Sequence, residues 1–299
     1  MSYKDPILLI TRSEIEDQSL LSALIRKALA QVAPSSRLYI QILYNYDSLN
    51  PLIEELITVY DTARKYNDEL NPIGVYALFG DNYLNLFECC KWSAILYHSQ
   101  DTLQQFQNKS HLETVQLTDL NNVYDRSYSL DDGTTLAGRK NEYHTVAVGG
   151  TFDHLHDGHK ILLTASAFLA RSILIVGVTG PKLLVNKKFA EYLESYEERV
   201  SSVTNFVKLV KFDLRIDIYQ INDVCGPTAQ INEIDALVVS LETASGGDYI
   251  NNVRKEKGFK QLDICVIGVI GTNPDEDDKF KDKLSSTHLR MLEAQKRQM

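Results

Sequence analysis

Cysteine is scarce in this sequence, with four residues in a chain of 299. Cys89 and Cys90 are adjacent, which disfavours a disulfide between them, while Cys225 and Cys265 stand in apolar stretches typical of small core residues. None of the four has the spacing of a metal-binding motif. We therefore expect a chain that works in a reducing compartment without structural disulfides.

Long apolar runs and an excess of basic charge are also missing. No stretch is apolar for the length that crosses a bilayer, and residues 1–6 include no apolar signal core. We expect no membrane partner and a cytoplasmic location, and nothing in the sequence excludes the nucleus. The formal net charge of −9 argues against a nucleic-acid partner, which a basic protein would favour, but not against a nucleotide held by local donors.

The most informative stretch runs from Val146 to Leu163. Its first residues form a short apolar run that predicts a buried strand, and Gly149 and Gly150 follow it. From His159 onward, apolar residues recur with the period of a helix. A strand that passes through a glycine-rich turn into a helix directs free backbone N–H groups toward one point, which suits a phosphate.

Two histidines flank a glycine at the start of this predicted helix, in the run His156-Asp157-Gly158-His159. Both rings can donate N–H bonds to phosphate oxygens, and Gly158 allows a nucleotide to approach the backbone. An imidazole is only weakly charged near neutrality, so it can stabilise charge that develops on a phosphate without binding the ground state too tightly. The run therefore predicts a second set of phosphate donors beside the turn.

Residues 149–153, Gly-Gly-Thr-Phe-Asp, together with the His-x-Gly-His run, resemble the signature of the nucleotidylyltransferase superfamily. The longer form, through residues 160–163, resembles the eukaryotic-type phosphopantetheine adenylyltransferase family. The resemblance implies a Rossmann-like fold, ATP and 4′-phosphopantetheine as substrates, and dephospho-coenzyme A and pyrophosphate as products, in coenzyme A biosynthesis. We also expect Mg²⁺ on the ATP phosphates, held largely by phosphate and water rather than by a protein cage.

The order of predicted elements divides the chain in two. Residues 1–120 alternate strand and helix signals and predict a smaller N-terminal α/β domain of unknown role. Residues 121–142 are polar and predict a linker or, alternatively, a surface loop within one domain. Residues 143–299 predict the nucleotidylyltransferase domain, with a parallel sheet covered on both faces. Its expected strands are 145–149, 172–178, 214–219, 235–240 and 263–270, and its expected helices are 158–170, 196–210, 247–257 and 286–297.

Within residues 1–120 we expect Ser13 to cap a helix that extends to about Val32, since Glu16 follows Ser13 three positions later. We expect this domain to stabilise the second one or to dock partners, among them other enzymes of coenzyme A synthesis. The remaining expected elements are strands 7–10, 38–43, 73–79 and 94–97 and a helix over 51–66.

A further candidate anion site lies near the end of the sequence, in the run Lys-Leu-Ser-Ser-Thr-His-Leu-Arg of residues 283–290. Ser285 or Ser286 is expected to cap the last helix, where hydroxyls and first-turn N–H groups can hold the β- and γ-phosphates of ATP. Arg290, one turn inside, would add a charged fork. A serine-rich cap is common by itself, but this segment resembles the C-terminal signature of the same family.

The family also carries a lysine that bridges the acceptor and the α-phosphate. The register set by residues 196–200, Tyr-Glu-Glu-Arg-Val, favours Lys187, with Lys182 and Lys188 as alternatives. Ser240 and Thr243 resemble part of a Val-Ser-x-Glu-Thr segment of the eukaryotic-type family and are expected to help bind the acceptor. The arginines that contact the acceptor phosphate in bacterial enzymes are absent, so Thr151 and Lys187 would carry more of that contact.

In the implied reaction the ionised acceptor phosphate attacks the α-phosphorus of ATP directly, so catalysis is alignment plus neutralisation of charge. Two alternatives stay open: a cytidylyltransferase of the same superfamily, and a scaffold protein with a silent transferase domain. The predicted residues are catalytic His156, His159 and Lys187; nucleotide-binding Gly149, Gly150, Thr151, Phe152, Gly158, Ser285, Ser286, Thr287 and Arg290; and acceptor-binding Thr151, Lys187, Ser240 and Thr243.

Overall fold

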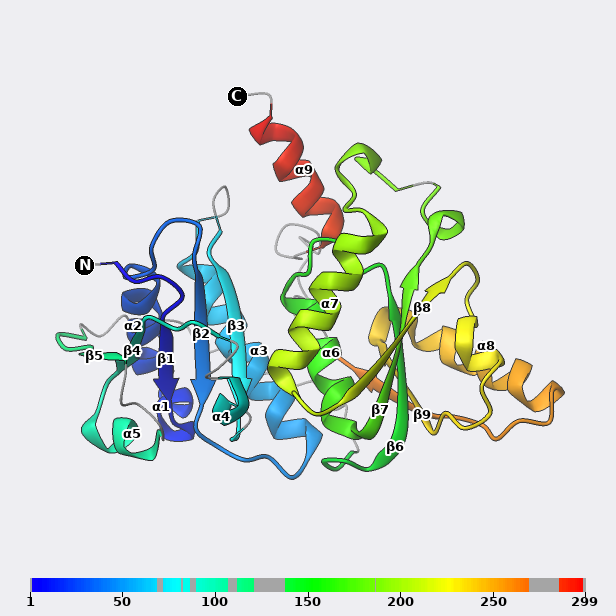
Figure 1. Ribbon diagram of the computed structural model, residues 1–299, viewed down its shortest axis with the longest axis horizontal. Helices are drawn as coiled ribbons and strands as arrows, with labels where there is room; N and C mark the ends of the chain where they lie inside the picture. Colours follow the sequence, from blue (N-terminus) through cyan, green and yellow to red (C-terminus); the bar gives the residue numbers. More distant parts are fainter. Residues whose placement is uncertain are drawn as a thin grey trace. The chain divides into compact units, whose positions relative to one another are not determined.

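The computed structural model describes residues 2–68, 72–81, 83–86, 90–106, 112–120, 138–185, 187–268 and 285–297. The chain forms two compact units, one of residues 1–46 and 54–133 and the other of residues 47–53 and 134–299 (Figure 1). Each unit has its own sheet of five parallel strands with helices beside it, which confirms the α/β class expected from the sequence. Most of the predicted linker lies outside the described residues.

The first unit has the strand order β3-β2-β1-β4-β5. All four residues of β1 are buried, because this strand lies in the middle of the sheet. Its strands are β1 (Ile7–Ile10), β2 (Arg37–Ile42), β3 (Gly74–Phe79), β4 (Ala94–Tyr97) and β5 (Glu113–Gln116), and its helices are α1 (Arg12–Glu16), α2 (Gln18–Leu29), α3 (Leu49–Lys65), α4 (Tyr83–Leu86) and α5 (Gln100–Gln105). The start of α3, as far as residue 53, belongs to the second unit.

The predicted start of the first helix was wrong. The chain has two helices here, and Thr11 rather than Ser13 is the N-cap of α1, because the Glu14 carboxylate accepts the Thr11 N–H at 2.7 Å. Asp17 then caps α2 by accepting N–H bonds from Ser19 and Leu20, which breaks the predicted single helix in two.

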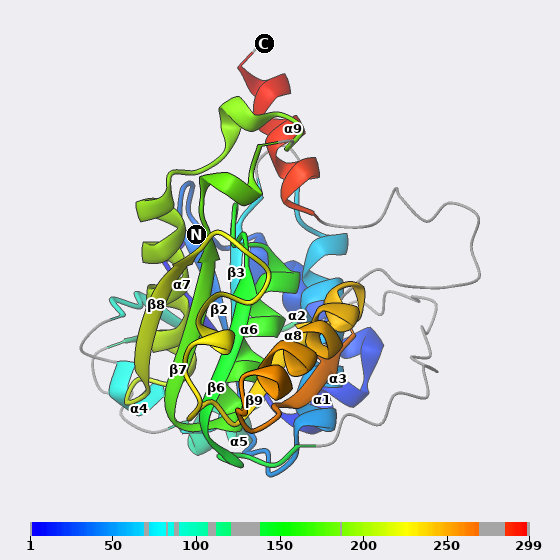
Figure 2. The ribbon, with the colours of Figure 1, turned by 90° about the vertical axis from the view of Figure 1, so that its right-hand side faces the viewer.

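The second unit has the strand order β10-β9-β6-β7-β8. Helices α6 and α7 cover one face of this sheet and α8 covers the other (Figures 1 and 2). Its strands are β6 (Tyr143–Gly150), β7 (Ala170–Thr179), β8 (Arg215–Ile221), β9 (Ala236–Ser240) and β10 (Asp263–Ile267), and its helices are α6 (Asp157–Leu169), α7 (Tyr196–Val210), α8 (Ala244–Glu256) and α9 (Ser286–Lys296). These elements match the predicted ones closely, except that β10 ends at Ile267.

The strand order positions the site. From β6 the chain moves outward through β7 to β8, then crosses back to β9 on the other side of β6 and ends the sheet with β10. The direction of winding therefore reverses between β6 and β9. In open α/β sheets, ligands bind beyond the carboxyl ends of the strands at such a reversal. The turn after β6 lies at this position.

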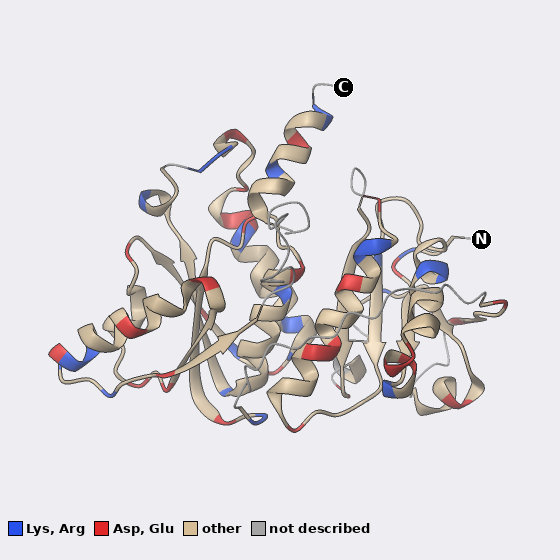
Figure 3. Ribbon diagram, turned by 180° about the vertical axis from the view of Figure 1, so that it is seen from behind, with Lys and Arg blue, Asp and Glu red and all other residues tan. Residues whose placement is uncertain are grey.

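Charged residues avoid the middle of both sheets. Strands β1, β4, β6 and β9, which have a strand on each side, carry no lysine, arginine, aspartate or glutamate. In Figure 3 the coloured positions lie mainly on helices and loops. This distribution is typical of parallel strands buried on both faces. Among the described residues, none of the helices has the length and apolarity that a membrane crossing requires.

Candidate active site

The turn after β6 has unusual backbone geometry. Phe152 and His154 have φ angles of 51° and 47°, in the left-handed region that residues with a Cβ seldom adopt. The Phe152 ring is buried and fills the space beside Gly150, where a Cβ would lie 3.0 Å from that ring. The predicted nucleotide-binding side chain of Phe152 is thus part of the core, and glycine at position 150 makes room for it.

The two predicted catalytic imidazoles meet at the start of α6. His156 is the N-cap residue and His159 lies in the first turn, and their rings stack with centroids 3.8 Å apart and planes 19° apart. The fit is close, since a Cβ on Gly158 would approach the His156 ring to 3.3 Å. The structure therefore brings His156, Gly158 and His159 together as the motif predicted.

Burial keeps this pair neutral. It lowers the pKa of His156 to about 4 and that of His159 well below its ordinary value. The Nδ1 atoms of both rings are buried and have no hydrogen-bond partner among the described residues. His156 also makes no side-chain capping bond to α6, so the first N–H groups of the helix are free to meet an anion.

Asp153 connects this turn to the C-terminal helix. Its carboxylate is fully buried, forms an ion pair with Arg290, and accepts the Glu194 N–H at 2.9 Å. Its backbone carbonyl accepts a hydrogen bond from Ser286 Oγ at 2.8 Å. Burial alone would raise the pKa of Asp153, but bonds from His154, Glu194 and Arg290 outweigh it and hold that pKa below its ordinary value. The two predicted motifs thus lie in direct contact.

His154 differs from its neighbours at 156 and 159. Its Nδ1 lies 3.0 Å from Asp153 Oδ1 and its Nε2 lies 3.0 Å from Glu293 Oε2, while its N–H donates to Glu194 Oε2 at 2.6 Å. The adjacent Asp153 carboxylate, and then the hydrogen bond to Glu293, raise the pKa of His154 to about 9 against the effect of burial. At neutral pH the site therefore has one charged imidazole beside two neutral ones.

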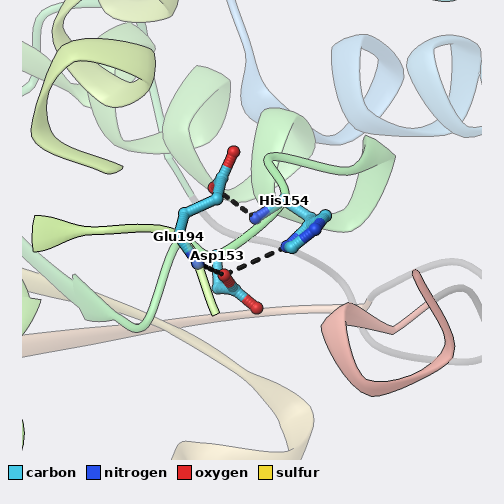
Figure 4. A group of neighbouring side chains, drawn as sticks. All are labelled: Asp153, His154 and Glu194. Atoms are coloured by element: carbon cyan, nitrogen blue, oxygen red, sulfur yellow. Dashed lines mark hydrogen bonds and ion pairs between the residues drawn. The ribbon is translucent and has the colours of Figure 1, made fainter. Parts of the chain in front are cut away.

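Asp153, His154 and Glu194 present ligand atoms within 4.8 Å of one another (Figure 4). A metal ion there would face the Arg290 guanidinium that already pairs with Asp153, and a His154 ring that is charged at neutral pH. Both repel a cation. The group is better described as an ion-pair network than as a metal site.

The serine-rich segment caps α9 as predicted, and Ser285 rather than Ser286 is the cap. Ser285 Oγ accepts the His288 N–H at 3.3 Å. Arg290 is buried, and besides Asp153 it donates to the Lys188 carbonyl at 3.0 Å and to Thr287 Oγ1 at 3.1 Å. Its predicted contact with phosphate stays a prediction, since the guanidinium already has protein partners.

The three candidate lysines lie in the segment between β7 and α7. Lys182, Lys187 and Lys188 are all exposed, and no ion pair of their side chains is found within the described part of the chain. Only Lys188 is tied to the site, through its carbonyl bond to Arg290. Lys187 stays the predicted residue.

Thr151, Ser240 and Thr243 lie at the same edge of the sheet, after β6 and β9. The carbonyl of Thr151 accepts a bond from Arg199 Nη1 at 2.8 Å, and the Ser240 and Thr243 hydroxyls lie 3.1 Å apart. The same Arg199 nitrogen donates to the Thr179 carbonyl at 3.0 Å and so joins the ends of β6 and β7. Sequence reasoning missed this role, because it used Arg199 only to set the register.

Known proteins share this second unit. A family model described as Cytidylyltransferase-like matches residues 147–292. The phosphopantetheine adenylyltransferase of Pyrococcus abyssi is 38% identical over 149 residues, which are 50% of this chain and 90% of that protein. The chain belongs to the phosphopantetheine adenylyltransferase family. The resemblance drawn from the motifs is thereby confirmed.

Two yeast relatives match this chain over only part of their own lengths. The phosphopantetheine adenylyltransferase of Saccharomyces cerevisiae is 48% identical over 152 residues, or 51% of this chain and 49% of that protein. An uncharacterized protein of Schizosaccharomyces pombe is 34% identical over 206 residues, or 67% of this chain and 64% of that protein. The chain thus spans about half and about two thirds of their lengths, and the second match extends beyond residues 134–299.

Proposed function

We propose that this chain transfers the adenylyl group of ATP to 4′-phosphopantetheine, giving dephospho-coenzyme A and pyrophosphate in coenzyme A biosynthesis. The observation that carries the proposal is the stacked neutral pair His156 and His159 at the open start of α6, with the serine end of α9 bonded to the adjacent turn. Membership of the phosphopantetheine adenylyltransferase family supports the choice of substrates.

In this reaction an oxygen of the acceptor phosphate forms a bond to the α-phosphorus of ATP, and the bond from that phosphorus to the bridging oxygen breaks. The bridging electrons leave with pyrophosphate, and no general base is needed because the acceptor is already ionised. His156 and His159 donate to α- and β-phosphate oxygens. These donors stabilise the charge that develops there, since a neutral ring keeps one N–H available.

The other predicted residues take positioning roles. Lys187, exposed on the segment before α7, bridges the acceptor phosphate and the α-phosphate, and Thr151 orients the acceptor with help from Ser240 and Thr243. The leaving pyrophosphate is held by the first N–H groups of α9 and by the hydroxyls of Ser285, Ser286 and Thr287. Arg290, buried one turn inside the helix, adds a positive charge. The adenine lies over the turn of Gly149 and Gly150.

Mg²⁺ would accompany ATP. Among the described residues, the single group of metal-ligand types is that of Asp153, His154 and Glu194, and its charges are already paired. The ion would therefore be held by phosphate oxygens and water rather than by carboxylates. It would neutralise part of the triphosphate charge.

The decisive experiment supplies the purified protein with ATP or CTP and with either 4′-phosphopantetheine or a phosphorylated alcohol, and follows pyrophosphate. We expect turnover with ATP and 4′-phosphopantetheine. The description of the matching family model makes a cytidylyltransferase the second candidate, and turnover with CTP and an alcohol phosphate would favour it. No turnover with any pair would favour the scaffold protein with a silent transferase domain.

The first unit would contribute outside the reaction. Its sheet carries no candidate for phosphate chemistry from the sequence, and we propose that it docks partner proteins, such as other enzymes of coenzyme A synthesis, or stabilises the second unit. The docking proposal is tested by comparing the proteins that co-purify with the full chain and those that co-purify with residues 134–299 alone. The same set of bound proteins in both samples would contradict it.

A further inference from the structure

Helix α9 contacts the turn after β6 through one polar face. Ser286, Arg290 and Glu293 are spaced by four and three residues, so they lie on the same side of the helix. All three bond to the consecutive residues Asp153 and His154. The contact is therefore concentrated on two residues of the turn that precedes the imidazole pair.

Helix α9 buries a single apolar side chain, that of Ala294. Arg290 and Ala294 are the buried residues of α9, and the rest of the helix is half-buried or exposed. One further contact places the Arg297 guanidinium 5.1 Å from the centre of the Tyr192 ring. These ion pairs and hydrogen bonds make the contact sensitive to the charge of each partner, since losing one leaves the other unpaired in a buried or half-buried position.

The charges around His154 come from every neighbouring segment. Asp153 stands on its own turn, Glu194 comes from the segment before α7, Glu198 from the first turn of α7, and Glu293 from α9. The nearby positive charges pair with the carboxylates on either side of His154. Arg290 pairs with Asp153, and Arg297 pairs with Glu293 at 2.6 Å. The ring is thus the cation that lies directly between the carboxylates of the turn and of α9.

We propose that His154 is a positioning residue: its charged ring, held between Asp153 and Glu293, seats α9 on the turn and thereby fixes where residues 285–287 face the triphosphate. The seating itself is independent of the reaction. Only the effect on nucleotide binding rests on the function proposed above.

The raised pKa of His154 determines how the contact between α9 and the turn depends on pH. Folding raises the pKa of His154 from 6.5 to about 9, so its contribution to seating is complete below about pH 6.5 and is lost as the pH rises through 9. A carboxylate whose pKa is lowered would instead lose its contribution as the pH falls. Release of α9 at alkaline pH therefore indicates His154, whereas release at acid pH indicates a carboxylate.

The test measures amide exchange of α9, as protection factors, in the full chain without substrate between pH 6.5 and 10. We expect protection of α9 in the wild type to fall about tenfold or more over this range, as a charge-assisted bond is lost. His154→Gln should show the low value already at pH 6.5 and no further fall. His154→Arg keeps the charge and should keep protection at pH 10.

Glu293→Gln provides a second variant in case arginine does not fit. It removes one of the two carboxylates, so the fall in protection should move to lower pH. His144→Gln, an exposed histidine near the start of β6, and Lys296→Gln, on the exposed side of α9, are matched controls that should follow the wild type. Unchanged exchange in β6 and β7 verifies that each variant is folded.

Activity separates the two proposals. In the adenylyl-transfer assay at pH 7, His154→Gln should raise KM for ATP about tenfold while kcat changes only a few-fold, because the chemistry lies with other residues. If the wild type shows no turnover, the function fails but the exchange result still decides the seating. Protection of α9 at pH 6.5 that is as high in His154→Gln as in the wild type would overturn the proposal.

Discussion

Three histidines lie within six residues, and one of them is charged at neutral pH whereas the other two are neutral. The side chains around each ring explain this difference. His156 and His159 stack on each other without a carboxylate bond, so burial disfavours their charged forms. His154 has a carboxylate at each ring nitrogen and favours its charged form. Position in the motif alone does not set the charge of a ring, because the partners come from distant segments.

Replacing His159 by alanine tests the role of the pair. Removing one positioned donor to developing charge typically lowers kcat by about a hundred- to a thousandfold. We expect His159→Ala to lose about that much kcat and to remain folded, as judged by circular dichroism and pyrophosphate release. His144→Ala serves as the control, and near-wild-type kcat in His159→Ala would refute the assignment.

Acid stability should depend on His156. Its pKa is lowered to about 4 in the folded chain, so its contribution to stability is present above the ordinary value of 6.5 and is lost as the pH falls toward 4. In urea unfolding at pH 7 and pH 4.5, His156→Asn should lose less stability between the two than the wild type, by on the order of 1–3 kcal/mol. Equal losses in both proteins would contradict this.

At the scale of the element, α6 is held at both ends. The Lys211 ammonium, just past α7, donates to the carbonyls of Ala167 and Ala170 and, at 2.5 Å, to Asn141 Oδ1. It therefore places a positive charge at the negative end of α6, while the imidazole pair lies at the other end. The helix that presents the two rings is fixed by a residue remote from them.

Replacing this lysine should destabilise the second unit. We expect Lys211→Met to lower the free energy of unfolding by about 1–2 kcal/mol, because it removes the charge and leaves α6 carbonyls without their donor. Lys255→Met, at an exposed position near the end of α8, is the matched control. The midpoint of urea unfolding measures both, and equal midpoints would disprove the capping role.

Elements with strong periodicity were predictable, and those defined by distant partners were not. The strands of the second unit are apolar runs, and the sequence placed them to within a few residues because burial on both faces requires such runs. Strand β5 was missed, since Glu113–Gln116 is mostly exposed and has no apolar run. The glycine turn and the imidazoles were likewise predictable, whereas Asp153, His154 and Arg199 act through partners up to 139 residues away.

At the scale of the whole molecule, the second unit includes a piece of chain from before β3. Residues 47–53 belong to it, and the Leu49 N–H donates to the Gly138 carbonyl at 3.0 Å while the Lys140 N–H donates to the Asp47 carbonyl at 3.0 Å. A cut at residue 134 therefore removes backbone partners that no pattern in the sequence assigns to this unit.

The fragment of residues 134–299 should keep the chemistry and lose stability. We expect kcat within a few-fold of the full chain, since the predicted catalytic residues lie within it. We expect the free energy of unfolding of this unit to fall by about 1–3 kcal/mol, because two backbone hydrogen bonds lose their partners. Thermal unfolding and the pyrophosphate assay measure both, and a fragment as stable as the unit in the full chain would contradict the expectation.

The bond between Ser286 and Asp153 joins residues 133 positions apart. A growing chain on the ribosome thus exposes the turn and both imidazoles long before α9 is made. A product of premature termination that stops before residue 285 would carry the histidine motif without the helix that seats against it. Synthesis order therefore ensures that only a chain translated past α9 can assemble both halves of the phosphate site.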